Sequence, residues 1–203
     1  GGLDINNQNA ANAFVNGLTG VLDRLEANNG DLLERAGYGR NIISRETGEI
    51  SLSFTGNANA TNAAQADGTT NVFSHFDDRS TLRIQSLAAI GGPFGNGAPP
   101  NGDYTVNTPR IRAEAGYVRD GFGFSFNLNP TFATQRTDLR IHPDGNNAGT
   151  LGCVGLQCTE NQGRIFYRTL TNAINTHGNL QMNINITGNP NNQGGGRIPN
   201  VNE

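Results

Sequence analysis

Apolar side chains recur at helical spacing near the start of the chain. Between Asn9 and Ala27 they follow the pattern i, i+4, i+7, i+8, i+11, which is one face of a helix: Phe14, Leu18, Val21, Leu22 and Leu25. A shorter helical segment is expected from Asp31, a residue type that favours the N-cap, to Ala36, before Gly37. The pattern predicts a helical arm that either packs on the same chain or binds a partner protein.

From residue 41 onward the pattern changes to alternation, which is typical of strands. Asn41 to Phe54 is expected to be a hairpin around the Glu46-Thr47-Gly48 turn. Residues 55–70 contain almost no large apolar side chain and are predicted to be a linker or long loop. Beyond them, short alternating segments at close spacing predict the strands of a sandwich or barrel: 81–90, 104–112, 117–119, 122–128 and 138–142.

One helix and one strand are expected near the end. Residues 162–176 carry apolar side chains at helical spacing, with Asn161 as the expected cap and Gly178 as the stop. Residues 180–186 alternate strictly, which predicts a strand with one buried face. The predicted fold is therefore mainly β with flanking helices (α+β). It has an arm, hairpin and linker over 1–70, a β-rich domain over 71–187 and a flexible tail over 188–203.

Composition removes several classes of function. All 14 basic residues are Arg, so a Walker-type lysine loop, a Schiff-base lysine and a Ser-Lys dyad are excluded. The net charge of −3 offers no basic surface for nucleic acid, and no apolar run of membrane-spanning length is present. His75, Asp77 and Asp78 lie close together, but no second His is near and the spacing fits no common ligand set. No metal and no cofactor are therefore expected.

The stretch with the most chemical content is DLRIHPDGNNAGTLGCVGL, residues 138–156. His142 and Cys153 lie 11 positions apart, and a thiol needs a neighbouring base or positive field to become a nucleophilic thiolate. Gly152 adds no bulk beside the sulfur, so the amides around Cys153 are expected to face a developing oxyanion. Arg136 and Arg140 flank the strand and suit a substrate carboxylate. The alternatives are a structural histidine, a buried thiol and solvated arginines.

These residues resemble the catalytic domain of the L,D-transpeptidase (YkuD-like) family, in a short-loop form like that of phage or secreted effector proteins. In that family a His at a strand end precedes a Ser/Thr-x-Gly-Cys-hydrophobic motif, matched here by His142 and by Thr150 to Val154. Upstream, residues 100–106 resemble the family's Pro-x-Gly-x-Tyr strand, with Tyr104 at the tyrosine position. Residue 155 is Gly where the family commonly has Arg, and residue 151 is Leu where it often has His.

The resemblance implies an L,D-transpeptidase-like β-sandwich or barrel that works as a cysteine acyl-transferase or peptidase on peptidoglycan stem peptides. Cys153 would form a thioester, and His142 would move the proton. The other residues expected at the site are Gly152, Val154, Pro143, Asp144 and Thr150 for the oxyanion or for orientation, and Arg140, Arg136 and Tyr104 for the substrate. A periplasmic, extracellular or virion-associated location follows from the same resemblance.

Two questions stay open at this level. A non-catalytic structural or interaction component of a virion or secretion apparatus would also retain the fold. Cys158 lies five residues after Cys153, and a suitable turn would allow the two to form a disulfide.

Overall fold

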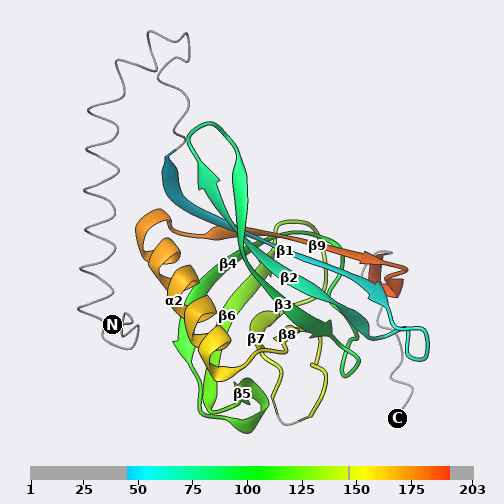
Figure 1. Ribbon diagram of the computed structural model, residues 1–203. Coiled ribbons are helices and arrows are strands. Elements are labelled where there is room, and N and C mark those ends of the chain that lie inside the picture. The colour runs from blue at the N-terminus through cyan, green and yellow to red at the C-terminus, as the bar shows by residue number, and fades with distance from the viewer. Residues whose placement is uncertain (1–44, 146, 193–203) are drawn as a thin grey trace, which may run out of the picture. The chain divides into compact units, whose positions relative to one another are not determined.

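The computed structural model describes residues 45–145 and 147–192. The chain divides into two units, Gly1–Arg45 and Glu46–Glu203, and the second contains all the described strands (Figure 1). The predicted helices over 9–27 and 31–36 lie outside the described residues. The strands are β1 (Glu46–Ala58), β2 (Ala66–Phe76), β3 (Thr81–Gly91), β4 (Gly102–Ile111), β5 (Val118–Arg119), β6 (Phe122–Pro130), β7 (Arg140–Pro143), β8 (Val154–Leu156) and β9 (Leu180–Thr187). The helices are α2 (Glu160–His177) and the short 3-10 segments η2 (Ala115–Tyr117) and η3 (Pro190–Asn192).

Eight of these strands form a closed barrel in the order β4-β9-β1-β2-β3-β8-β7-β6, and β6 pairs back with β4. Closure gives each strand of the ring two neighbouring strands. Most neighbours are antiparallel, whereas β1–β9 and β7–β8 are parallel. The mainly β class expected from the sequence is confirmed. The parallel β7–β8 pair contains His142, and Cys153 directly precedes β8.

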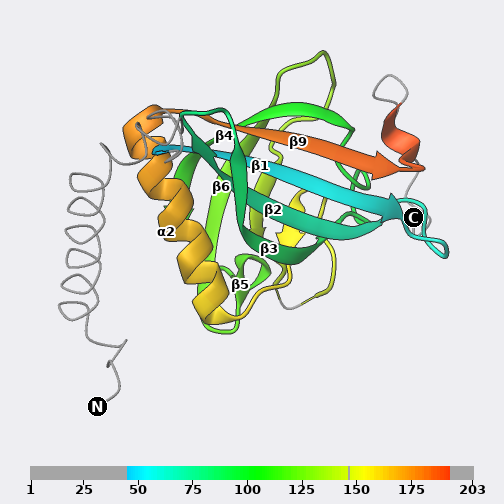
Figure 2. The same cartoon turned by 45° about the horizontal axis from the view of Figure 1, so that its top comes forward.

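Strict alternation fills the barrel interior. In β9 every second residue is buried and the residues between them are exposed, as predicted. The helix α2 begins at a capping box made by Thr159 and Gln162, two residues before the expected cap. Its buried Phe166 stacks on Phe124 of β6 with ring centroids 5.8 Å apart, so α2 covers part of the core (Figure 2). Among the described residues, no helix combines the length and apolar character that a membrane span requires.

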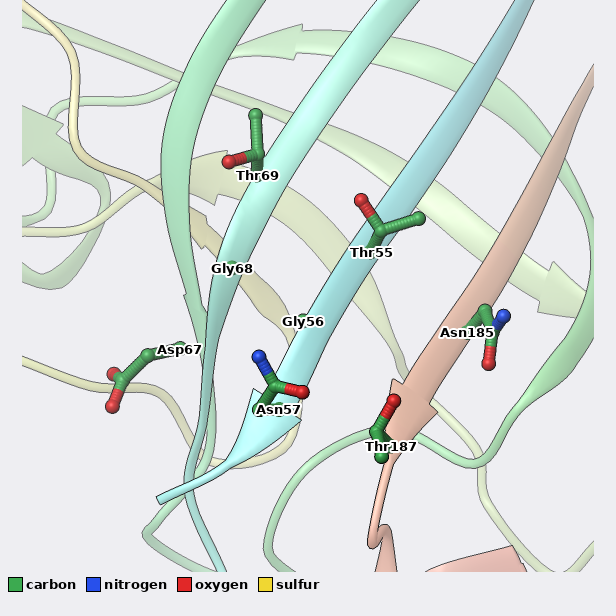
Figure 3. Close-up of a pocket in the computed structure, with 8 residues that line it drawn as sticks. All are labelled: Thr55, Gly56, Asn57, Asp67, Gly68, Thr69, Asn185 and Thr187. Carbon is green, nitrogen blue, oxygen red and sulfur yellow. The ribbon is translucent and has the colours of Figure 1, made fainter. Parts of the chain in front are cut away.

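The predicted linker over 55–70 is wrong, because most of it is strand. Residues 55–58 continue β1, residues 66–70 begin β2, and the expected turn at 46–48 lies inside β1. The strands meet at Gly56 and Gly68, where a Cβ on either glycine would collide with the backbone of the other strand (Figure 3). The inward residues of this strand pair are small, and outward residues such as Thr55 and Thr69 are polar. The pair therefore lacks the alternation of large apolar side chains by which a strand is predicted. The barrel begins at Glu46 rather than at residue 71.

The expected flexible tail also begins as packed structure. Asn189 and Asn191 are buried, and the Asn189 side-chain amide donates to the Pro99 carbonyl at 2.8 Å. The Asn191 side-chain amide donates to the Asn96 carbonyl at 3.2 Å. Residues 188–192 therefore fasten the end of β9 to the loop before β4.

A fragment starting at Asn71 is expected not to fold, whereas one starting at Arg45 is expected to fold. The shorter fragment loses β1 and half of β2, and with them the buried Ile50, Leu52 and Phe54. Each such side chain contributes about 1.5–3 kcal/mol on burial, against a total stability of about 5–15 kcal/mol for a domain. Circular dichroism and amide NMR dispersion of the two fragments make the measurement. A folded fragment from Asn71 would show that the barrel does not need β1.

Candidate active site

The parallel pairing of β7 with β8 places the thiol and the imidazole on one face. Ile141 is aligned with Val154, and both side chains are fully buried in the core. Side chains alternate along a strand. His142, Arg140 and Cys153, which directly precedes β8, therefore share the opposite face, with Cys153 level with Arg140.

The carbonyl of Pro143 orients the imidazole of His142. Nδ1 lies 2.7 Å from that oxygen. A carbonyl only accepts hydrogen bonds, so Nδ1 carries the proton and Nε2 of the neutral ring carries the lone pair. The ring of Tyr117 lies beside the imidazole, with centroids 4.8 Å apart. The proton-accepting nitrogen is therefore fixed by the local backbone.

Burial keeps His142 uncharged. Its side chain is 7% exposed, and this burial lowers the pKa of His142 to about 4, although the hydrogen bond with Pro143 opposes the shift. The positive charges of Arg140 and Arg112 lower the pKa further. At neutral pH the ring is thus a neutral base.

Cys153 is held as a neutral thiol. It is 8% exposed, and Sγ lies 4.0 Å from the carbonyl oxygen of Asp138. Burial raises the pKa of Cys153, while the backbone of Arg140 and the charges of Arg140 and Arg136 act in the opposite direction. At rest the site therefore holds a thiol and a neutral imidazole, rather than a thiolate and an imidazolium.

Thr150 fixes the turn before Cys153. Its hydroxyl donates to the Cys153 carbonyl at 2.7 Å and accepts from the amides of Gly92 at 3.1 Å and Gly152 at 3.3 Å. The Gly152 amide expected at an oxyanion is thus bound inside the turn. Gly152 itself has φ +116, and a Cβ there would collide with the guanidinium of Arg136. Thr150 and Gly152 shape the turn that presents Cys153.

Asp144 holds the loop after β7 and does not orient the imidazole of His142, which is bound by the Pro143 carbonyl. Its carboxylate is fully buried, and Oδ1 accepts from the Gly149 amide at 3.0 Å. Arg119 donates to the Asp144 carbonyl at 3.1 Å and lies 3.9 Å from Oδ2. Burial raises the pKa of Asp144, and the Gly149 amide and Arg119 oppose this. Of the two orienting groups expected from the sequence, the Pro143 carbonyl is the one bound to Nδ1.

Two residues expected to bind substrate serve the scaffold instead. Tyr104 is fully buried, and its hydroxyl donates to the Pro100 carbonyl at 2.6 Å. The buried guanidinium of Arg136 donates to three backbone carbonyls, those of Asn96 at 2.8 Å, Gly97 at 3.0 Å and Ala98 at 3.2 Å. Sequence alone does not reveal that these polar groups are already satisfied inside the fold. Arg140 is the predicted substrate-binding residue that remains on the face of the thiol.

Gly155 cannot be replaced by the arginine that the resembled family commonly has there. A Cβ at 155 would lie 2.7 Å from Thr150 Cγ2 and 3.2 Å from Asp144 Cβ. Both distances are shorter than ordinary van der Waals contact, and neither atom is the end of a long flexible side chain. Any positive charge near the thiol must therefore come from elsewhere.

Arg136→Ala is expected to lower the free energy of unfolding by about 2–4 kcal/mol, because hydrogen bonds from a charged group contribute about 1.5–3 kcal/mol and the bonds of the guanidinium to the carbonyls of Asn96, Gly97 and Ala98 are lost. The exposed Arg168 of α2 supplies the matched control. Arg168→Ala is expected to change stability by no more than about 0.5 kcal/mol. Urea unfolding of both variants makes the comparison, and equal midpoints would refute the scaffold role of Arg136.

Two residues near His142 carry no signal in the sequence: the ring of Tyr117 contacts the imidazole, and Arg112 acts on it through its charge. They lie before β6, far from residue 142 in sequence, and no local motif marks them. Cys158 does not form the disulfide with Cys153 that the spacing would allow: both thiols are free, and Cys158 belongs to the hydrophobic core. Burial raises the pKa of Cys158 to about 11.

Two hollows of the described surface lie away from the thiol. One of about 390 Å³ lies over β1, β2 and β9 and is lined by side chains such as Asn57 and Asn185 (Figure 3). Another of about 540 Å³ lies beside α2 and includes Ile50 and Ile84. Neither is lined by Cys153 or His142. Leu151, two residues before Cys153, is exposed.

Comparison with known proteins does not assign a protein family. No family model, no curated protein sequence and no solved structure matches this chain. Within the described residues, no group of three or more His, Cys, Asp and Glu side chains is placed to hold a metal ion.

Proposed function

We propose that this protein is a cysteine acyl-transferase or peptidase of L,D-transpeptidase type that acts on peptidoglycan stem peptides. One observation carries the proposal. His142 and the thiol of Cys153 share one face of the β7–β8 pair, and the Pro143 carbonyl leaves Nε2 as the proton acceptor. This placement supports the assignment of Cys153 as nucleophile, His142 as base and the Pro143 carbonyl as the group that orients the base. The L,D-transpeptidase assignment rests on the sequence motif around these two residues.

The proposed reaction has two halves. Nε2 of His142 takes the thiol proton while Sγ attacks the peptide carbonyl. The bond to the leaving amine then breaks as the imidazolium returns the proton to it, which leaves a thioester on Cys153. Water or a second amine attacks the thioester and releases the free thiol. Water gives hydrolysis of the stem, and an amine gives exchange or cross-linking.

Positive charge near the sulfur supports the first half. The thiolate that forms lies in the field of Arg140 and Arg136, both of which act to lower the pKa of Cys153. These charges favour the anion once His142 has taken the proton. No arginine at position 155 is needed for this stabilisation.

The second candidate is a non-catalytic component of a virion or secretion apparatus. The observation that favours it is the low exposure of Cys153, 8%, together with burial that raises the pKa of the thiol. A buried neutral thiol is typical of a structural cysteine. The two candidates differ in whether stem peptides change, and a periplasmic, extracellular or virion-associated location suits both.

Incubation with purified muropeptides tests the proposal. Wild-type protein under reducing conditions is expected to convert tetrapeptide stems to tripeptides, and to exchange the terminal residue when a labelled D-amino acid is added. Mass spectrometry distinguishes the two products. Stems that remain intact would favour the non-catalytic candidate.

A further inference from the structure

Tyr117 connects two arginines to the catalytic imidazole. Nη1 of Arg140 donates to the Tyr117 hydroxyl at 3.3 Å. Cζ of Arg112 lies 5.0 Å from the centroid of the same ring, a cation–π contact. The ring also lies beside His142. These groups stand next to the reacting atoms, and the proposed mechanism gives Tyr117 and Arg112 no role.

The guanidinium of Arg140 has hydrogen-bonding capacity left over. Its Nε is buried and has no hydrogen-bond partner in the described part of the chain. Its Nη2 reaches Asp138 Oδ1 only at 3.5 Å, and the Asp138 side chain is 83% exposed. An ion pair of this length with so exposed a partner contributes little. The side chain of Arg140 is 26% exposed, and within the described residues its terminal Nη1 and Nη2 make only these two contacts, with Tyr117 and Asp138. A planar guanidinium with unused terminal donors is suited to bind a carboxylate.

The guanidinium of Arg112 is held by hydrogen bonds, whereas that of Arg140 has donors left unused. Nε of Arg112 donates to Ser125 Oγ at 2.9 Å, and Nη1 lies 3.3 Å from Glu114 Oε1. Arg112 therefore holds the Tyr117 ring in place. The Tyr117 hydroxyl accepts from Arg140 and keeps its own proton to donate. Adjacent strands lie about 4.8 Å apart, so a group bound by Arg140 stands directly beside Cys153.

We propose that Arg140 and Tyr117, with Arg112 behind them, form a carboxylate-binding site beside Cys153, and that Asp138 is its resident counter-ion until an anionic substrate displaces it. This deepens the proposed function, on which its biological meaning rests. It restricts the acyl donor to compounds that carry a free carboxylate close to the reacting carbonyl. It also assigns to β7 and the segment around η2 the positive charge for which position 155 has no room.

The relative rates of two alkylating reagents at Cys153 test the site without any assumption about stem peptides. Iodoacetate carries a carboxylate, and iodoacetamide is its neutral counterpart. The measured quantity is the alkylation rate with iodoacetate divided by the rate with iodoacetamide. This ratio cancels differences in thiolate fraction, and peptide mapping separates Cys153 from Cys158. Arg140→Gln is expected to lower the ratio about tenfold, since one charge-assisted contact is of that size. Tyr117→Phe is expected to lower it by a smaller factor.

Two variants give matched controls. Asp138→Asn removes the counter-charge, and asparagine tolerates the left-handed backbone of Asp138, φ 58. This variant is expected to raise the ratio. Arg168→Gln removes the same charge from an exposed position on α2 and is expected to leave the ratio unchanged. Thermal unfolding shows whether each variant is folded.

A measurement on the wild type alone covers the case in which Arg140→Gln does not fold. N-acetyl-D-alanine is expected to slow alkylation of Cys153, and N-acetyl-D-alaninamide is not. Equal protection by both compounds, or a ratio in folded Arg140→Gln equal to that of Arg168→Gln, overturns the carboxylate site even if stems are cleaved. Conversely, if Arg140→Gln lowers the rate ratio but the wild type leaves stems intact, the carboxylate site stands and the proposed function is refuted.

Discussion

Cys153→Ala is expected to abolish both hydrolysis and exchange of stem peptides. In the proposed mechanism the thioester forms on the sulfur that shares a face with His142. Cys158 cannot replace it, because its thiol is 3% exposed and its pKa is raised to about 11. Mass spectrometry of muropeptides after long incubation measures the loss, which is expected to reach the limit of detection.

Cys158→Ala is the matched control for this variant. It removes a thiol of the same type from the core and is expected to keep activity, with a modest loss of stability because a small buried group is lost. Full activity of Cys153→Ala would contradict the mechanism. Equal loss in both variants, with unfolding of both, would point to stability instead.

His142→Ala is expected to cost about two to four orders of magnitude in rate at neutral pH, the usual contribution of a general base. Burial raises the pKa of Cys153, so without the base only a minor fraction of the thiol is ionised at pH 7. The rate of the variant should therefore rise about tenfold per pH unit towards alkaline pH, as the thiolate fraction grows.

The wild-type protein should lose activity only at the acid end of the pH range. Because the pKa of His142 is lowered to about 4, the imidazole stays neutral through the mildly acidic range. Activity should therefore fall only when the pH approaches that value and the ring becomes protonated. Rates of stem cleavage from acid to alkaline pH make the measurement, with His177→Ala, an exposed histidine of α2, as the control. A variant rate independent of pH would contradict the role of His142 as base.

Strict alternation made parts of the fold predictable. The strand β9 and the helix α2 were expected because one face of each is buried and the other exposed, which fixes a clear period. The first strands were missed for the opposite reason. At Gly56 and Gly68 the chains approach so closely that no side chain fits, and this geometry leaves no apolar signal. A pattern of small residues describes a linker and a tight strand pair equally well.

The site was predictable only where its parts lie close in sequence. His142 and Cys153 flank a short loop, and the strands on either side of it pair. The roles of the other residues depend on burial, which the sequence does not show. Tyr104 and Arg136 carry groups that could bind substrate, but in the fold both donate to backbone carbonyls. Tyr117 reaches His142 only because η2 contacts β7 across the fold, and such a contact has no trace in local spacing.

The acyl-enzyme itself tests the central claim most directly. Wild-type protein incubated with a tetrapeptide stem and quenched in acid is expected to show an added acyl group by intact mass. Peptide mapping should place this group on Cys153, hydroxylamine should remove it, and Cys153→Ala should not acquire it. Cleaved stems with no adduct on Cys153, or with the adduct on another residue, would contradict the account.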